Sequence, residues 1–409
     1  MPDEMSLTTD RRRLMQALAA AWPFSRIGAA APPPAATARP NVYANLGIRP
    51  VINFQGTMTT LGASKMPPEV HAAMAEASRD FVMLEEVKEK VGERIAKLAG
   101  TEAAMVTSGA AGAIALATYA CLTGTDNAKV RQLPDLTGMK KQAVIQKAHR
   151  NGYDHAVRSA GLKIIDVETK DQLANALTPD TAIMYFLGGS SHDWEYETPI
   201  SLEECVRMCK QAGVPLLVDA ANMLPPWGNV PKVAASGADL LAVSGGKHIR
   251  GPQSSGILAG RKDLITAAWL NSSPHSDSQG RGMKVNREEM IGLLVAIERY
   301  SKLDFDALDR ECARQADYLM KEFTKLKLKT EKLPFDRTRR VHRVKVTWDE
   351  KATGLTVRDV EKQLRDGEPR IVVLRGSKGQ GLEFTCFMNE PGDEKIAAGR
   401  MGEIFTKSA

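Results

Sequence analysis

The sequence has 409 residues, of which 43% are hydrophobic and 25% charged, so it is long enough for two domains with separate cores. Its net charge of +6 is mild and is spread along the chain, without the basic block that is typical of nucleic-acid binding. No apolar run reaches the length of about 20 residues that a membrane-spanning helix needs, so insertion into a membrane is not expected.

The cysteine and histidine spacings exclude the common metal and hydrolase motifs. The five cysteines are odd in number, and the pair Cys205 and Cys209 is neither a CxxC motif nor half of a zinc site. Buried free thiols are the expected state. The sequence contains no HExxH and no GxSxG, so neither a protein metal site nor a serine hydrolase is predicted.

The N-terminal 40 residues differ in character from the rest. Arginines at positions 11–13 precede an Ala/Leu segment at 16–21, and a Pro/Ala-rich stretch ends in Ala-Thr-Ala at 36–38. This pattern resembles a twin-arginine export leader with an A-x-A cleavage site, which predicts a periplasmic protein. The apolar segment is short and interrupted, so a disordered or partly helical tail of a cytoplasmic protein is the alternative. We exclude residues 1–40 from the predicted fold.

The first predicted elements are an arm and two helices. Residues 41–66 are expected to form an N-terminal arm, with a short extended piece and too little periodicity to be core. A helix follows Pro67-Pro68, where proline suits the first turn. The next helix ends at Gly100 and has one apolar face, formed by Val87, Val91, Ile95 and Leu98.

Short apolar strands then alternate with helices. The predicted strands are 103–107, 144–149, 162–167, 181–187, 214–219, 238–243 and 255–259. Near-continuous apolar strands separated by helices predict an α/β fold with a mainly parallel, seven-stranded sheet covered on both faces. Ligand sites in such sheets lie at the C-terminal ends of the strands. Ser108, His149, Asp219 and Lys247 follow strands there.

The C-terminal part has a different pattern. Residues 288–325 are expected to be one long helical connection. Beyond it, strands at 342–348, 371–374 and 382–388 and helices at 356–365 and 393–405 predict a small α+β domain. The expected organisation is a large domain at 67–290, a connecting helix at 291–325 and a small domain at 326–409.

Lys247 follows an apolar strand and the turn Gly245-Gly246. A partly desolvated lysine can hold a neutral amine, as Schiff-base formation requires, and we expect the two glycines to let a planar ring come close. Asp219 ends the neighbouring strand, 28 residues earlier, where a buried acid would keep a pyridine nitrogen protonated. His149 is the candidate that lies flat on the ring.

A Gly/Ser turn at a helix start is a candidate phosphate site, because its N–H groups and the helix dipole favour an anion. Its residues are Ser108, Gly109 and Ala110, and Ser244 is a further candidate. Each feature also has a plain interpretation. Asp219 could cap a helix, His149 could be a polar core residue, Lys247 could sit in a solvated turn, and the small residues could serve tight packing. Together, in this order, they predict a pyridoxal-phosphate (PLP) site.

Four sequence motifs carry a family resemblance: SGGK at 244–247 with GPQ at 251–253, AHRNGYDHAVR at 148–158, PVIN at 50–53 and GRGMKV at 280–285. The chain resembles fold-type I PLP enzymes of the selenocysteine synthase (SelA-like) branch, and most of all the D-glucosaminate-6-phosphate ammonia-lyases. The resemblance covers residues 41 to about 300 well and the C-terminal part loosely. It implies the PLP-dependent transferase fold and a homodimer or larger oligomer, with sites at the subunit interface.

The resemblance also implies roles for single residues. Lys247 would be the Schiff-base lysine and proton shuttle, Asp219 would pair with the pyridine nitrogen, and His149 would stack. Ser108, Gly109 and Ser244 would hold the phosphate. The residues expected to bind substrate are Arg281, Lys284, Arg150 and Arg375. Arg375 is a candidate for a carboxylate, because a guanidinium fork fits one, although a surface charge near a strand end is the alternative.

Two differences from the selenocysteine synthases narrow the range of possible reactions. Selenocysteine synthases have a tRNA-binding module at the N-terminus, whereas this chain has the candidate leader there. Those enzymes also carry an arginine in the stretch that corresponds to residues 62–64, which are Gly-Ala-Ser here. Both argue against selenium transfer to tRNA, and an export leader argues against a phosphorylated sugar acid. The sequence therefore predicts a PLP-dependent lyase that removes ammonia from a β-hydroxy amino acid or an amino sugar acid. A PLP-dependent racemase, and a non-catalytic protein that binds a phosphate ligand or a partner on the same scaffold, are the alternatives.

Overall fold

The structure is a computed structural model that describes residues 42–188, 199–335 and 340–406. The predicted leader at 1–40 lies outside the described residues. Residues 42–50 belong to a separate N-terminal unit, in which Ala44–Leu46 forms a 3-10 turn, and Val51–Ala409 forms the second unit. Everything below concerns the second unit.

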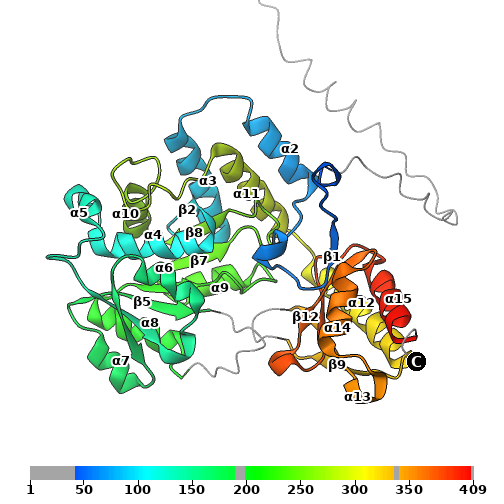
Figure 1. The fold of residues 1–409 in the computed structure, drawn as a ribbon. Coiled ribbons are helices and arrows are strands. Elements are labelled where there is room, and N and C mark those ends of the chain that lie inside the picture. The colour runs from blue at the N-terminus through cyan, green and yellow to red at the C-terminus, as the bar shows by residue number, and fades with distance from the viewer. Residues whose placement is uncertain (1–41, 189–198, 336–339, 407–409) are drawn as a thin grey trace, which may run out of the picture. The chain divides into compact units, whose positions relative to one another are not determined.

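A seven-stranded sheet lies at the centre of the larger part of this unit (Figure 1). Its strand order is β2 (Ala103–Thr107), β8 (Gly256–Gly260), β7 (Leu240–Ser244), β6 (Leu216–Asp219), β5 (Thr181–Leu187), β3 (Gln142–Gln146) and β4 (Lys163–Val167). Strand β8 runs in the opposite direction to the other six strands. The prediction of a mainly parallel sheet is confirmed.

Helices cover both faces of this sheet, because the strand side chains alternate between two apolar cores. Val144 of β3 lies in one core, whereas Ala143 and Ile145 lie in the other. The first face is covered by α2 (Pro68–Ala77), α3 (Leu84–Ala99), α7 (Lys170–Ala176), α8 (Leu202–Ala212), α9 (Asn229–Ala235) and α11 (Arg287–Tyr300). The second is covered by α4 (Gly109–Thr123), α6 (His155–Arg158) and α10 (Lys262–Leu270), and a short helix α5 spans Asn127–Gln132.

A smaller antiparallel sheet forms the C-terminal part. Its order is β12 (Leu374–Arg375), β13 (Leu382–Cys386), β10 (His342–Thr347) and β9 (Lys329–Leu333). Its helices are α12 (Phe305–Lys325), α13 (Glu350–Thr353), α14 (Val357–Asp366) and α15 (Asp393–Thr406). Phe323 and Phe384 lie in the core between them, with ring centroids 5.0 Å apart. The predicted small α+β domain is therefore present.

The segment after Pro50 is not only an arm. Residues Val51–Asn53 form β1, which pairs in parallel with β11 (Arg370–Val372) of the C-terminal part. The next residue, Phe54, is fully buried in the C-terminal core, where its ring lies 5.5 Å from that of Phe384. The prediction that residues 41–66 contribute nothing to a core is wrong, because a three-residue strand and one aromatic side chain are too short to show periodicity.

The prediction of one connecting helix at 291–325 is also wrong. Helix α11 ends at Tyr300, and α12 begins at Phe305. Asp304 caps the start of α12, since its carboxylate accepts the N–H groups of Asp306 and Ala307. Helix α11 packs on α2 and α3, whereas α12 packs on β9, β10 and α15. The two helices therefore belong to different cores, and the break between them lets the chain pass from one to the other.

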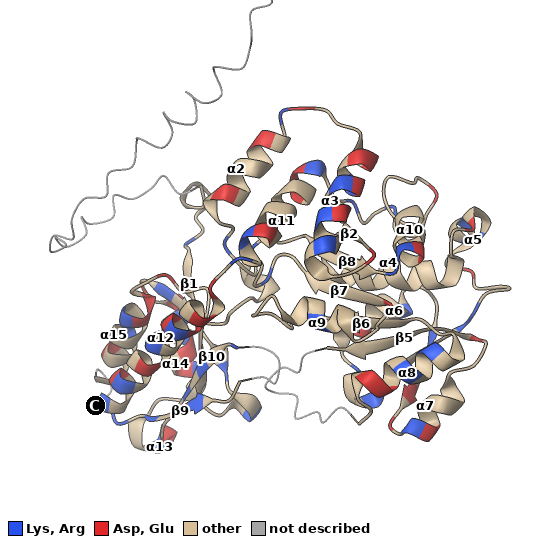
Figure 2. Ribbon diagram, turned by 180° about the vertical axis from the view of Figure 1, so that it is seen from behind, with Lys and Arg blue, Asp and Glu red and all other residues tan. Residues whose placement is uncertain are grey.

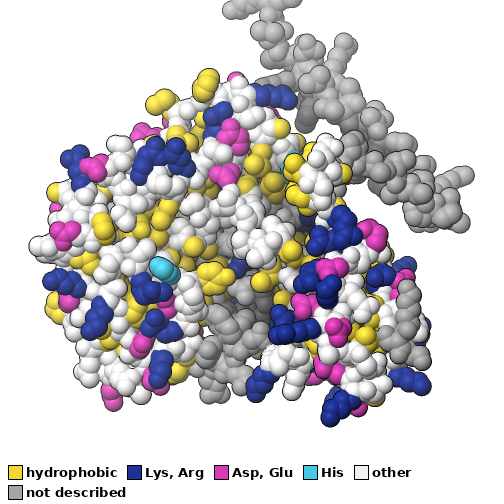
Figure 3. All heavy atoms as spheres, in the orientation of Figure 1, with side chains coloured by type: hydrophobic (Ala, Val, Ile, Leu, Met, Phe, Trp, Pro, Cys, Tyr) yellow, Lys and Arg dark blue, Asp and Glu magenta, His cyan; other side chains and the backbone are white. Residues whose placement is uncertain are grey.

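The charged residues lie mostly on the helices, whereas the ribbons of β5, β6 and β7 carry few of them (Figure 2). Basic and acidic side chains are interspersed over the face shown in Figure 3. In the residues that the structure describes, no helix is long and apolar enough to cross a membrane. All five cysteines are free thiols, and four of them are buried. Burial raises the pKa of Cys205 and Cys312 to about 12, as expected for inert thiols.

Candidate active site

The predicted phosphate site lies where β2 passes into α4. The helix begins at Gly109, with Ser108 at its N-cap position. Gly109 has a φ of 72°, a conformation that suits glycine, and its carbonyl accepts the hydroxyl of Thr107 at 2.9 Å. Because the first N–H groups of a helix have no partner within the helix, Gly109 and Ala110 lie where they can bind an anion.

Gly256 at the start of β8 shapes this site, and it is a residue that the sequence analysis missed. It pairs with Thr107 on one side and with Ser244 on the other, so β8 brings the two predicted phosphate-binding segments to the same sheet edge. A Cβ atom at position 256 would lie 2.3 Å from the carbonyl carbon of Gly109. Only glycine allows this approach of β8 to the start of α4.

Asp219 ends β6 and is only 5% exposed. Its Oδ2 accepts the hydroxyl of Tyr185 at 2.8 Å, and its Oδ1 accepts the N–H of Ala221 at 3.0 Å. Burial raises the pKa of Asp219, while these two hydrogen bonds and the positive charge of Lys247 oppose the rise. The buried acid and the lysine are therefore electrostatic neighbours, as the sequence predicts.

The turn that carries Lys247 is held on both sides. The hydroxyl of Ser64 donates to the carbonyl of Gly246 at 2.7 Å, and Nε of Arg250 donates to the carbonyl of Lys65 at 2.7 Å. Lys247 itself is half-buried, and its carbonyl accepts the N–H of Arg250 at 3.1 Å. Residues 64 and 65 thus fix the lysine turn from the segment after β1.

The glycines of this turn lie close to neighbouring parts of the protein. A Cβ atom on Gly245 would lie 2.4 Å from the hydroxyl of Ser255 and 2.6 Å from Leu293 of α11. A Cβ atom on Gly246 would lie 2.5 Å from the backbone of Gln253. The Cβ positions of both glycines thus face protein. They allow the turn to pack on its own return path and on α11.

His149 lies on a 3-10 turn, Lys147–His149, because β3 ends at Gln146 rather than at His149 itself. Its side chain is 2% exposed, and its ring meets that of Phe186 edge-on, with centroids 4.6 Å apart. Burial lowers the pKa of His149 to about 4, so the imidazole is neutral at pH 7. Nδ1 accepts the N–H of Leu187 at 3.3 Å, which assigns the proton to Nε2. A neutral, flat ring suits stacking on a cofactor.

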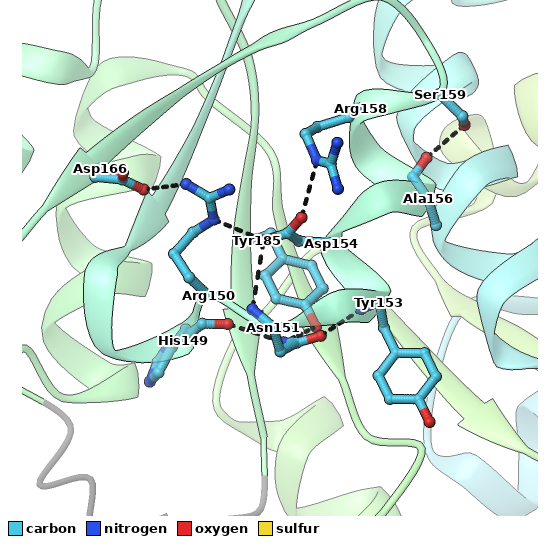
Figure 4. Close-up of polar contacts among 10 residues, drawn as sticks. All are labelled: His149, Arg150, Asn151, Tyr153, Asp154, Ala156, Arg158, Ser159, Asp166 and Tyr185. Carbon is cyan, nitrogen blue, oxygen red and sulfur yellow. Dashed lines mark hydrogen bonds and ion pairs between the residues drawn. The ribbon is translucent and has the colours of Figure 1, made fainter.

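The four predicted substrate-binding residues come from three separate segments of the chain. Nε of Arg150 bonds to Asp154 at 2.6 Å and its Nη1 bonds to Asp166 at 2.7 Å, as Figure 4 shows. Asp154 also accepts Arg158 at 3.0 Å and is 2% exposed. The guanidinium of Arg150 is thus bound by the carboxylates of Asp154 and Asp166. This geometry favours a role in stabilising the turn after β3 over a role in substrate binding.

Arg375 belongs to β12 of the C-terminal sheet and pairs with Glu361 at 3.1 Å, about half exposed. Arg281 is half-buried, with Nη1 at 3.5 Å from the hydroxyl of Ser273, and Lys284 is exposed. The structure thus brings the predicted cofactor residues to one sheet edge. These residues are Ser108, Gly109, Ala110, His149, Asp219, Ser244 and Lys247. Of the predicted substrate residues, Arg150 and Arg375 form ion pairs with carboxylates of the chain itself.

A pocket of about 210 Å³ lies beside the lysine turn. Its walls include His248 and Arg250 of that turn, Tyr300 of α11 and Gln315 of α12. None of the predicted site residues lines it. In the described ranges, no group of three or more His, Cys, Asp or Glu side chains is placed to hold a metal ion.

The aminotransferase class-V family model matches residues 60–380. The chain belongs to this family. The seven-stranded sheet, the lysine turn after β7 and the acid at the end of β6 thus lie within the matched region. Enzymes of this fold use PLP, and the residues at this sheet edge fit it. They include a lysine beside a buried acid, a helix start for the phosphate and a neutral imidazole for the ring.

Two curated relatives cover nearly the whole chain. A D-glucosaminate-6-phosphate ammonia-lyase of Salmonella typhimurium is 32% identical over 382 residues, which are 90% of this chain and 97% of the relative. A 5′-C-glycyluridine monooxygenase-decarboxylase of Streptomyces is also 32% identical, over 88% of this chain and 91% of the relative. A solved D-glucosaminate-6-phosphate ammonia-lyase superposes with a TM-score of 0.78 at 30% identity, covering 90% of this chain and 99% of that one. The resemblance seen in the motifs is confirmed.

Proposed function

We propose that this protein is a PLP-dependent ammonia-lyase that acts on a β-hydroxy amino acid or an amino sugar acid. The proposal rests on Asp219 and Lys247, whose charges lie near each other at the ends of adjacent strands. The acid suits the pyridine nitrogen of PLP, and the amine suits its aldehyde. The similarity to an ammonia-lyase along 90% of the chain supports this reaction over the alternatives.

When bound, PLP acts as an electron sink for the charge that develops as the α-proton leaves. Lys247 would hold the cofactor through Nζ, and the same amine would take up the α-proton of the substrate. Asp219 keeps a proton on the pyridine nitrogen, and the N–H groups of Gly109 and Ala110 bind the phosphate. His149 covers the ring and excludes water from one face. The β-hydroxyl would leave as water with the proton held on Nζ of Lys247. The enamine product would tautomerise to an imine, and hydrolysis of this imine by one water gives a keto acid and ammonia.

The test is a screen of D- and L-amino acids and amino sugar acids with the PLP-loaded protein, scored for ammonia, inversion and oxygen uptake. We expect ammonia and a keto acid from β-hydroxy amines. The visible absorption band of the lysine-bound cofactor should disappear on borohydride treatment and in Lys247→Ala. The exposed Lys302 provides a matched control, since Lys302→Ala should keep both the band and the activity.

The outcomes separate the competing functions. Inversion without ammonia would show a racemase, and a colourless protein after reconstitution would show a non-catalytic binder. The relative from Streptomyces adds a third possibility to exclude, because its name describes an oxygen-dependent decarboxylation. Carbon dioxide release that depends on oxygen would therefore overturn the lyase proposal.

We also propose that the protein is a homodimer or larger oligomer. The segment between α2 and α3 exposes three consecutive apolar residues, with Phe81 99%, Val82 52% and Met83 65% exposed. A second copy of the chain that covers this segment would remove apolar surface from water. Light scattering of the wild type and of a Phe81→Ser/Met83→Ser variant tests this proposal. A monomeric wild type at micromolar concentration would refute it.

The N-terminal arginine motif supports a further proposal, that residues 1–38 are an export leader and that the mature protein is periplasmic. Such a location favours an unphosphorylated substrate over a phosphorylated sugar acid. The N-terminal sequence of the protein purified from cells decides the matter. We expect it to begin after Ala38, and an intact N-terminus in the cytoplasm would contradict the leader.

A further inference from the structure

A chain of hydrogen bonds connects Asp219 with His149, the two residues that we expect to contact the cofactor ring. Tyr185 of β5 is fully buried and donates its hydroxyl to Oδ2 of Asp219 at 2.8 Å. In the register of the sheet, Leu187, two residues further along β5, pairs with Asp219. Tyr185 therefore reaches the acid from the neighbouring strand.

Asn151 continues this chain of hydrogen bonds. Its side-chain amide donates to the hydroxyl of Tyr185 at 3.4 Å and to the backbone carbonyl of His149 at 2.9 Å. Its Oδ1 accepts the N–H of Tyr153 at 2.7 Å, and this third contact fixes which end of the amide is which. Figure 4 shows Asn151 between His149 and the hydroxyl of Tyr185.

The acid needs these contacts because of its burial. A carboxylate that is removed from water tends to keep its proton, yet a neutral Asp219 could not pair with a protonated pyridine nitrogen. Two donors oppose this tendency, Tyr185 on Oδ2 and the N–H of Ala221 on Oδ1. Each oxygen retains a lone pair for a further donor. Burial and the nearby Asp219 also raise the pKa of Tyr185, so its hydroxyl remains a donor.

We propose that Tyr185 and Asn151 are positioning residues of the cofactor site. Tyr185 holds the Asp219 carboxylate ionised and oriented toward the pyridine nitrogen, and Asn151 ties this hydrogen bond to the backbone of His149. The acid and the stacking imidazole are thereby placed as one unit. The inference rests on the proposed PLP site and adds residues that act through Asp219 and His149.

The experiment measures cofactor binding instead of turnover. Apoprotein is titrated with PLP, and the protonation of the ring nitrogen is read from the ¹⁵N chemical shift of labelled PLP. Tyr185→Phe removes one hydrogen bond to a charged group, so we expect PLP to bind at least about tenfold more weakly. The ¹⁵N shift should move toward that of an unprotonated ring. Asn151→Ser keeps an acceptor for Tyr153 and should show the same changes to a smaller extent.

Two controls separate positioning from general stability. Tyr119 is equally buried, and its hydroxyl bonds to Ser159 at 3.2 Å, so Tyr119→Phe loses a hydrogen bond but should leave the ¹⁵N shift unchanged. In an Asp219→Asn background, Tyr185→Phe should no longer alter PLP affinity, since the carboxylate on which it acts is absent.

The inference is overturned if Tyr185→Phe binds PLP like wild type with the same ¹⁵N shift, or if its effect is as large in the Asp219→Asn background. Either result would leave the PLP site intact. A wild-type protein that binds no PLP would instead overturn the cofactor site, and this inference with it.

Discussion

Gly256 and Gly109 approach so closely that a Cβ atom on Gly256 would lie 2.3 Å from the carbonyl carbon of Gly109. Gly256→Ala must therefore push β8 away from the start of α4, where we place the phosphate. We expect PLP affinity to fall at least about tenfold, because the loss of one or two hydrogen bonds to a charged group is sufficient for this change. Gly399→Ala is the control, since a Cβ atom there would meet no atom within 4 Å outside the local backbone of its own helix. Equal affinities for the two variants would refute the placement.

Asp219→Asn removes the negative charge while keeping the shape of the side chain. Because Asp219 is 5% exposed, its partner charge on the pyridine nitrogen would be left unpaired in a buried site. We expect turnover to fall by at least about a hundredfold, with a smaller loss of PLP affinity. Single-turnover kinetics at saturating PLP measure the first effect. Turnover within a few-fold of wild type would show that Asp219 does not face the nitrogen.

The burial of His149 predicts a pH dependence of stability. The pKa of His149 is lowered to about 4 in the folded protein from a usual value near 6.5, so the unfolded chain binds more protons between these pH values. Stability therefore rises with pH across this window. The contribution is complete above pH 6.5 and is lost as the pH falls toward 4, by about 3 kcal/mol in total.

The measurement is urea unfolding of the apoprotein at several pH values. His149→Phe should flatten the pH dependence between pH 4 and 6.5, whereas the same substitution at the exposed His71 should leave it unchanged. A His149→Phe curve parallel to that of wild type would contradict the lowered pKa.

Arg150→Gln tests whether this arginine holds the fold or binds substrate. Its guanidinium bonds to Asp154, which is 2% exposed, so the variant should lose stability by about 1–2 kcal/mol with little change in KM. Thermal unfolding and steady-state kinetics provide the two readouts. A large rise in KM at unchanged stability would restore the substrate role.

Arg281→Gln and Lys284→Gln should behave in the opposite way. Arg281 is half-buried and Lys284 is exposed, and an ion pair to either is absent from the described residues, so both are available to an anionic substrate. We expect KM to rise about tenfold or more in the double variant, with stability near that of wild type. An unchanged KM would remove both residues from the substrate site.

The sequence predicts the parts of the site that follow from local pattern. Apolar strands and helix starts place Asp219, Lys247 and Ser108 at one sheet edge, because parallel strands end there together. Tyr185 escaped this reasoning, since it lies inside an otherwise apolar strand and its partner is on the next one. A hydroxyl in a fully buried strand needs a partner, and that was the signal available.

Features that depend on distant packing were not predictable. Gly245 and Gly246 face Ser255, Leu293 and Gln253, and nothing in the local pattern distinguishes such packing from an open space for a ligand. The break between α11 and α12 lies in an otherwise helical pattern, where only Asp304 marks a new helix start.

The pairing of β1 with β11 has a consequence for how the chain folds during synthesis and for which fragments of it are soluble. Phe54 completes a core whose other residues lie between Ala316 and Ile404, so the chain must be synthesised almost to its end before this core can close. Such a contact between distant segments slows folding and leaves apolar surface exposed in the meantime. A C-terminal fragment that starts at α12 would emerge with a gap where Phe54 belongs. Adding a peptide spanning residues 50–56 should rescue its solubility.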